Sequence, residues 1–208
     1  MIYVAFTWGL ADVYYRPSLN DIRSWIIEDK DINDDSWDRL YSNLMKAQQL
    51  DPSNPDIREN LAIALEGRYA KFAAGEIEAE TNRNKALAHY RTSVSLRPSW
   101  PYAWNSLMAV KFRLGQIDKE FFNVFHQAER LGRWEPDIQR MLVNIGLMNW
   151  LQFPASERAY LLEIVKRSLQ KQPNEILDIA KNYGLLDVIC LLNKEIENVA
   201  KTCSTKKQ

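Results

Sequence analysis

The sequence contains few of the residues on which compact binding sites depend. Its 208 residues include seven glycines, two cysteines and two histidines. Because glycine is scarce and the eight prolines fall mostly between apolar-periodic segments, the chain is expected to form long helices joined by short connections. Basic and acidic residues balance at 27 each, and no dense basic run lies in the expected folded part. Nucleic acid is therefore not an expected partner.

The residues that usually carry catalysis or bind metals form no recognisable pattern. His89 and His126 lie on separate expected helices, and neither is four positions from a second metal ligand. The sequence has no G-x-S-x-G, no glycine-rich phosphate loop, no H-E-x-x-H and no paired-carboxylate signature. Cys190 and Cys203 have neither a metal spacing nor a disulfide framework, and we interpret them as one core thiol and one thiol in a loose tail. No catalytic residue, metal or cofactor is predicted.

The N-terminal segment, residues 1–19, is unusually apolar. MIYVAFTWGLADVYY has only Thr7 and Asp12 as polar residues, and Arg16-Pro17 is predicted to stop it. A membrane-spanning helix needs about 20 apolar residues, and a secretory signal needs a basic start and a small-residue cleavage site. Two interpretations remain: a first helix that covers the end of the core, or a short or truncated membrane anchor with Trp8 at the headgroup level.

Beyond this segment, apolar residues recur at helical spacing in paired stretches, each pair ending near a proline. The stripes are Leu40, Leu44, Ala47; Leu61, Ala62, Leu65, Tyr69, Phe72; Ala86, Tyr90, Val94, Leu96; Trp104, Leu107, Met108, Lys111; Phe121, Phe125, Ala128; Leu142, Val143; and Leu161, Ile164, Val165, Leu169. Residues 20–199 are predicted to form one helical-repeat domain, and the polar, basic tail 200–208 is predicted to be disordered.

The pattern resembles a tetratricopeptide (TPR) array, whose 34-residue period has a large residue early in helix A, a leucine three positions later and a proline at the end. Trp104 and Leu107 match it in register, and Trp104 is expected in the core. From Pro52 to Pro98 is 46 residues, which exceeds one period. An extended helix through 75–80 with a turn at 81–82 is expected to absorb the excess. The predicted fold is all-α: a TPR-like α-solenoid of antiparallel helix pairs with irregular, stretched repeats.

Such an array has a concave surface that suits a bound segment of another protein. The repeat register points polar and aromatic residues of helix A toward that surface, and aromatic residues are enriched at interface hot spots. The candidate partner-binding residues are Trp100, Tyr102, Asn105, Phe112, Trp134, Arg140 and Asn144. Of the aromatic ones, Trp100 and Tyr102 are not required by the apolar stripe, and Trp134 lies in a later joint.

Several stretches go beyond a generic repeat, above all RPSWPYAW (97–104) and LGRWEP (131–136), together with YYRPSLNDIRSW (14–25) and AKNYGLLDVICLL (180–192). Together they resemble the VpsP family of polysaccharide biosynthesis proteins over nearly the whole chain. The resemblance implies a part in making or exporting a bacterial exopolysaccharide, and association with the inner membrane through the N-terminus of an otherwise soluble protein. It implies no catalytic residue.

Two functions follow as expectations. The first is a non-catalytic scaffold that binds proteins of a polysaccharide synthesis or export machine. The alternative is a carbohydrate-binding module in which Trp100, Tyr102 and Trp134 stack on sugar rings. An enzyme acting on the polysaccharide or its precursor would need dispersed carboxylates that no motif indicates.

Overall fold

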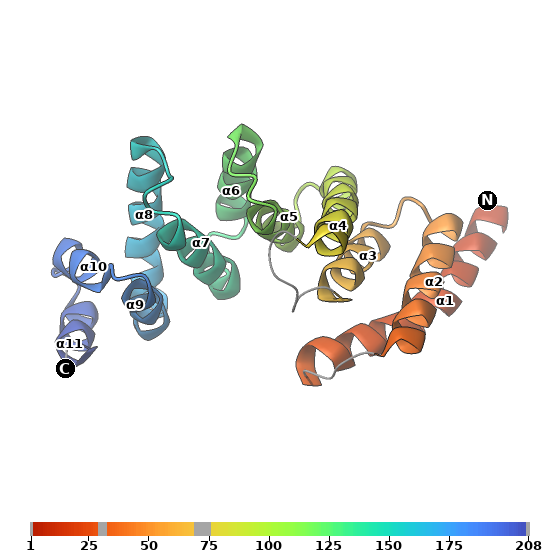
Figure 1. Ribbon diagram of the computed structural model, residues 1–208, viewed down its shortest axis with the longest axis horizontal. Helices are drawn as coiled ribbons and strands as arrows, with labels where there is room; N and C mark the ends of the chain where they lie inside the picture. The colour runs from red at the N-terminus through yellow and green to blue at the C-terminus, as the bar shows by residue number, and fades with distance from the viewer. Residues whose placement is uncertain (1, 29–32, 69–75, 207–208) are drawn as a thin grey trace. The chain divides into compact units, whose positions relative to one another are not determined.

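A computed structural model describes residues 2–28, 33–68 and 76–206 of the chain (Figure 1). The described residues form helices and no strands, which confirms the predicted all-α, TPR-like fold class. The helices are α1 (Ile2–Glu28), α2 (Asp34–Leu50), α3 (Pro55–Arg68), α4 (Ile77–Leu96), α5 (Pro101–Arg113), α6 (Lys119–Leu131), α7 (Pro136–Met148), α8 (Ala155–Lys171), α9 (Pro173–Asn182), α10 (Leu186–Leu192) and α11 (Glu197–Lys206).

Proline marks the start of every second helix from α3 to α9. Pro55, Pro101, Pro136 and Pro173 are the first residues of α3, α5, α7 and α9. At this position the missing N–H has no intrahelical partner to lose, and the fixed φ favours the first turn. These four helices are therefore the A helices of the repeat, and the prolines set where each begins.

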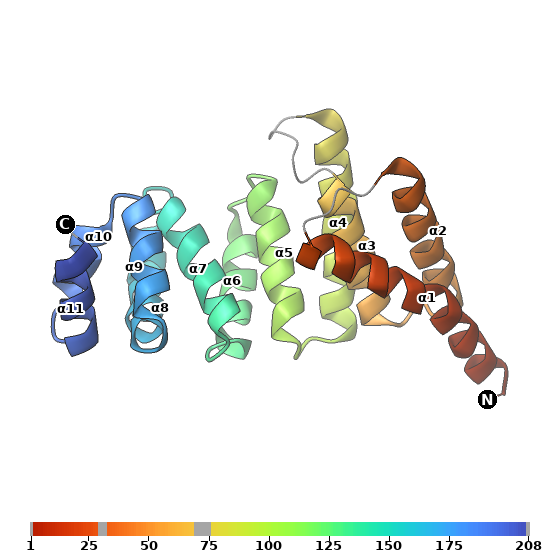
Figure 2. The same cartoon turned by 90° about the horizontal axis from the view of Figure 1, so that it is seen from below.

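The chain divides into two compact units, residues 1–122 and 123–208. In the N-terminal unit, consecutive helices from α1 to α5 pack side by side, as Figure 1 and Figure 2 both show. Its core joins α1, α2 and α3 through fully buried aliphatic side chains, which include the predicted stripe residues Leu40, Leu44, Ala47 and Leu61.

In the C-terminal unit, α7 packs against α8 and α9, and α9 contacts α10 and α11. The predicted stripe residues Leu142, Val143, Leu161 and Ile164 are all buried. Gly146 allows α8 to approach α7 closely, because a Cβ at this position would lie 2.6 Å from both terminal carbons of Leu161. A larger residue here would require the buried Leu161 side chain to shift.

The N-terminal helix differs from its prediction, because α1 continues through Arg16-Pro17 to Glu28. An internal proline removes one backbone hydrogen bond and disfavours the helix. Packing on both sides of Pro17 offsets this cost: Ala11 and Ile22 are buried, and the Ser18 hydroxyl donates to the Tyr14 carbonyl at 3.1 Å. Residues 2–19 thus belong to the same helix as residues 20–28, whereas a boundary after residue 19 was expected.

The first turns of α1 leave apolar side chains on the surface. Phe6, Trp8 and Val13 are each more than half exposed. Across the described residues, no helix is long and apolar enough to cross a membrane.

The C-terminal tail also differs from its prediction. Residues 200–206 belong to α11, and Cys203 forms a disulfide with Cys190 of α10, so the prediction of two free thiols is wrong. Val199 and Cys203 lie four positions apart on one helical face and are both buried. The polar composition of the tail concealed this short apolar face.

The expected turn at 81–82 is wrong, because α4 runs through both residues. Leu96, assigned to a buried stripe, is 41% exposed near the end of α4. The stripe residues Tyr69 and Phe72 lie outside the described residues, as does residue 75 of the segment expected to absorb the excess length, and residues 77–80 of that segment belong to α4.

Candidate partner-binding surface

The A helices α3 and α5 present equivalent faces in the N-terminal unit. When their first prolines are aligned, residues of α3 correspond to the positions that the sequence assigned to the binding surface of α5. The equivalent pairs are Asp56 and Tyr102, Glu59 and Asn105, and Glu66 and Phe112. The positions of α3 that correspond to the candidate residues of α5 are therefore acidic, and of these Asp56 is half exposed whereas the Glu59 and Glu66 side chains are 14% and 12% exposed.

An aromatic pair opens α5. Trp100 is the N-cap residue and is 40% exposed, and its ring lies 5.4 Å from that of Tyr102. The Arg97 guanidinium lies 4.7 Å from the Trp100 ring centroid, which is within cation–π distance. Both contacts favour this position of the Trp100 ring, and a side chain that is ordered before a partner binds costs less entropy on binding.

Farther along α5, the predicted surface residues Asn105 and Phe112 are half-buried. The Asn105 Oδ1 atom is enclosed and has no hydrogen-bond partner among the described residues. Trp104, predicted for the core, is only half-buried, and its indole N–H donates to the Pro98 carbonyl at 2.8 Å. That bond ties the ring to the joint between α4 and α5.

Arg97 also links this joint to the start of α3. Its guanidinium lies 2.6 Å from the Asp56 carboxylate and 3.6 Å from that of Glu59. Burial raises the pKa of Glu59, and the positive charge of Arg97 opposes this effect. The arginine thus contacts the Trp100 ring and balances the acidic residues of α3 at the same time.

A cavity of about 390 Å³ lies at the other end of this face. Among the described residues, its lining comes from three helices: Ile63, Glu66 and Gly67 of α3, Arg83 and Tyr90 of α4, and Arg113 of α5. Glu66 is the central group, since its Oε1 accepts from Arg113 Nε at 2.7 Å and its Oε2 accepts from the Tyr90 hydroxyl at 3.0 Å. Sequence reasoning missed this site, because no local motif links residues 66, 83 and 113.

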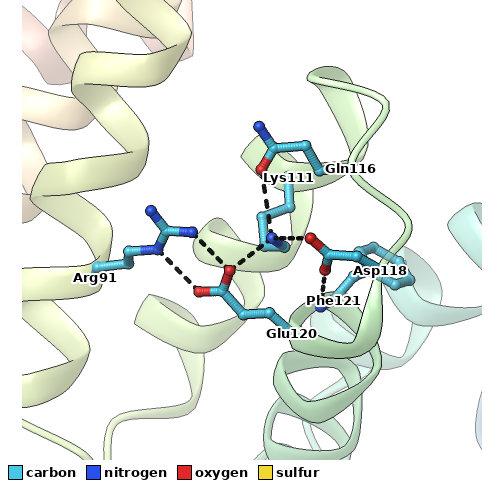
Figure 3. Close-up of polar contacts among 6 residues, drawn as sticks. All are labelled: Arg91, Lys111, Gln116, Asp118, Glu120 and Phe121. Carbon is cyan, nitrogen blue, oxygen red and sulfur yellow. Dashed lines mark hydrogen bonds and ion pairs between the residues drawn. The ribbon is translucent and has the colours of Figure 1, made fainter.

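A buried lysine fixes the turn that follows α5 (Figure 3). Lys111 is fully buried, and its Nζ donates to Glu120 at 2.8 Å, to Asp118 at 3.1 Å and to Gln116 at 3.4 Å. Glu120 also accepts two hydrogen bonds from Arg91 of α4. These contacts hold the beginning of α6 against α4 and α5.

Asp118 has a second role as the helix cap. Its Oδ1 accepts from the backbone N–H of Phe121 at 2.8 Å, which satisfies one of the free donors in the first turn of α6. The hydrogen bond from Arg91, the largest influence, lowers the pKa of Glu120 to about 2. Both carboxylates are therefore ionised at neutral pH, and the cluster acts as a structural clamp.

The other three predicted surface residues belong to the C-terminal unit. Trp134 lies in the turn before α7 and is 66% exposed. Arg140 pairs with Asp137 and donates to Gln172 at 3.3 Å. Asn144 accepts from the Tyr183 hydroxyl at 2.9 Å, so its amide joins α7 to the end of α9. Trp134 is thus the exposed member of this set, and the other two already have partners.

The described residues contain no group of three or more metal-ligating side chains. His126 lies 2.8 Å from the Glu157 carboxylate and against the Tyr160 ring. His89 is half-buried, and burial lowers its pKa to about 4. Polar and aromatic contacts therefore explain the position of His126, and burial explains the lowered pKa of His89.

Comparison with known proteins supports the fold. No family model and no curated protein match the sequence. Among solved structures, the crystal structure of MamA, a TPR-like helical-repeat protein, matches with a TM-score of 0.51 and 16% sequence identity. The match covers 82% of this chain and 92% of that chain. At this identity the likeness concerns the fold alone.

Proposed function

We propose that the protein is a non-catalytic helical-repeat adaptor that binds a segment of a protein partner on the α3–α5 face. The observation that carries this proposal is the Trp100–Tyr102 pair at the start of an A helix, in which Trp100 is exposed and contacts Arg97 and Tyr102 is half-buried. Aromatic side chains in such positions contribute large contact area at low entropic cost. In this proposal the pair belongs to the face on which helical-repeat proteins bind their partners.

The partner belongs, in this proposal, to a bacterial exopolysaccharide synthesis or export machine. The support is the resemblance of RPSWPYAW and LGRWEP to the VpsP family. Attachment to the inner membrane is part of the same proposal, and the exposed Phe6, Trp8 and Val13 of α1 support it, since such side chains favour the membrane interface.

Deletion of the gene tests the biological part. The expected result is a loss of secreted polymer that the wild-type gene restores. Restoration should fail with a gene carrying Trp100→Ala and Tyr102→Ala, although the variant accumulates normally. Normal polymer output after deletion would contradict the assignment to this machine.

Carbohydrate binding is the second candidate, and the exposure of Trp134 favours it. An exposed indole face can stack on a sugar ring. Titration with oligosaccharide fragments of the polymer should then change the tryptophan fluorescence, and Trp134→Phe should reduce the change. Fluorescence unmoved by every fragment would remove this candidate.

A further inference from the structure

The C-terminal unit ends in a disulfide that joins its last two helices. Cys190 of α10 and Cys203 of α11 are 13 positions apart in the sequence, and their Cα atoms lie 6.0 Å from each other, within the usual range for this bond. The sequence contains two cysteines, so neither has another partner in the chain. The pairing is therefore specified by the fold of this unit alone.

Both cysteines have the surroundings of a structural disulfide. Cys190 is 8% exposed and Cys203 is 6% exposed. Disulfides that act in catalysis or redox sensing need a sulfur that partner thiols can reach, and many catalytic pairs have the C-x-x-C spacing. This pair has neither property. Because the cytoplasm keeps thiols reduced and its disulfides are mainly of the transient, catalytic or sensing kind, a buried structural disulfide indicates an oxidising compartment.

Helix α11 depends on this bond for its position. It has 10 residues, and an isolated helix of that length is marginal in water. Among its described side chains, Val199 and Cys203 are buried, whereas Ala200, Lys201 and Ser204 are exposed. One of the two buried side chains thus belongs to the disulfide itself. Because so little apolar surface holds α11 against α9 and α10, the covalent bond contributes much of what keeps it there.

We infer that the C-terminal unit folds in an oxidising compartment outside the cytoplasm, where a thiol–disulfide oxidoreductase joins Cys190 to Cys203 and thereby locks α11 in place. One cysteine thiolate attacks the disulfide of the oxidoreductase and forms a mixed disulfide, and the second thiolate then displaces the oxidoreductase as a dithiol. The protein loses two electrons and two protons, and the oxidoreductase gains them. Because both cysteines are buried once α11 is packed, this exchange precedes that packing.

The inference goes beyond the adaptor function and does not rest on it. In the bacterial cell of the proposed function, the oxidising compartment is the periplasm. The placement adds a side to the proposed membrane attachment, because the C-terminal unit then meets its partners outside the cytoplasm. A partner of this unit that lies wholly in the cytoplasm is excluded.

Acid trapping of thiols in living cells tests the compartment. Cells that express the full-length chain are quenched with trichloroacetic acid, which stops thiol exchange, and the denatured protein is treated with a polyethylene-glycol maleimide. This reagent slows the protein on a gel once for each free thiol. Wild type should gain no addition before reduction with dithiothreitol and two after it. The matched control, Cys190→Ser with Cys203→Ser, should gain none in either state.

Two additions to wild type without reduction would overturn the proposal. They would do so even if the purified protein contained the disulfide, because the bond would then have formed after the cells were opened. The structure itself would stand in that case, and the compartment would be wrong.

Reporter fusions after the last residue give the compartment without touching the cysteines. Alkaline phosphatase is active only where its own disulfides form. Green fluorescent protein that is exported in the unfolded state stays dark outside the cytoplasm. The phosphatase fusion should therefore be active and the fluorescent fusion dark. An inactive phosphatase together with a fluorescent partner fusion would overturn the proposal.

Hydrogen exchange measures the lock on α11. Cys190→Ala removes the bond from the α10 side and leaves α11 itself unchanged. Its α11 amides should exchange about a hundredfold faster than those of wild type, while the α7 amides change little. The matched control, Ala200→Ser, alters an exposed position of α11, keeps the disulfide and should exchange like wild type. Equal protection of α11 in Cys190→Ala and wild type would overturn the locking role.

Discussion

The cluster of Lys111, Asp118 and Glu120 predicts that removing the cation costs less stability than removing its anionic partners. Lys111→Met replaces the fully buried lysine side chain with an apolar one and so removes the ammonium. Asp118 and Glu120 have side chains that are 54% and 41% exposed, so water can solvate them once the lysine is gone. Because the desolvation cost of the ammonium disappears as well, the free energy of unfolding should change by no more than about 1 kcal/mol.

The reverse change leaves a buried charge without compensation. The double variant Asp118→Asn, Glu120→Gln removes both anions but keeps acceptor oxygens of similar size, including an acceptor for the Phe121 N–H. The Lys111 ammonium then remains fully buried, and the structure should lose about 3–5 kcal/mol. Urea unfolding of the full-length protein at neutral pH, followed by circular dichroism, compares the two variants with wild type.

The pH dependence supplies a second readout of the same cluster. The pKa of Glu120 is lowered from its ordinary 4.5 to about 2 in the folded protein. Its contribution to stability is therefore complete above about pH 5 and is lost as the pH falls toward 2. Glu120→Gln should flatten this part of the acid-unfolding curve. The reasoning is refuted if Lys111→Met costs as much as the double variant.

Three further predictions concern other parts of the structure. Gly146→Ala should destabilise the C-terminal unit by about 1–3 kcal/mol, because the new methyl group overlaps Leu161, and a lowered Tm in differential scanning calorimetry would show it. Reduction of the Cys190–Cys203 disulfide should lower stability by about 3 kcal/mol, and mass spectrometry of the native protein should detect no free thiol; two alkylated cysteines would contradict the structure. His89 should titrate near pH 4 by NMR, because burial lowers its pKa. Its contribution to stability is therefore complete above pH 6.5 and falls as the pH drops toward 4. A titration midpoint near pH 6.5 would exclude the burial of His89.

The helical framework could be predicted from the sequence because its signals are local. Apolar residues at helical spacing, such as Leu40 and Leu44 or Leu161 and Ile164, mark one face of a helix, and these faces are buried as predicted. Proline at the first position of α5 and α7 fixes the joints for a similar local reason. The all-α, TPR-like class follows from these signals together.

The errors have a common physical cause, which is packing that overrides a local rule. Pro17 predicts a helix end, but buried neighbours on both sides hold α1 together. The tail after residue 199 is polar in composition, yet Val199 and Cys203 share a face that packs inward. Tertiary contacts of this kind have no signature in a short stretch of sequence.

The candidate surface could be predicted only in part. The repeat register placed Tyr102, Asn105 and Phe112 on one face of α5, and Lys111 in the apolar stripe, where it is buried. The register did not give the acceptors of Lys111 or the partners of Arg113. Those contacts join residues such as Glu66 and Arg113 on separate helices, and only the packing of α3, α4 and α5 brings them together.

The most direct test of the adaptor function is co-purification of the full-length protein from membranes, with mass spectrometry of the retained proteins. Trp100→Ala with Tyr102→Ala is the test variant, and Ile77→Ala, which removes an 82% exposed side chain outside the candidate surface, is the matched control. The account predicts that wild type and control retain glycosyltransferase or export components that the test variant loses. Retention of no protein by any of the three forms, or equal retention by all of them, would contradict it.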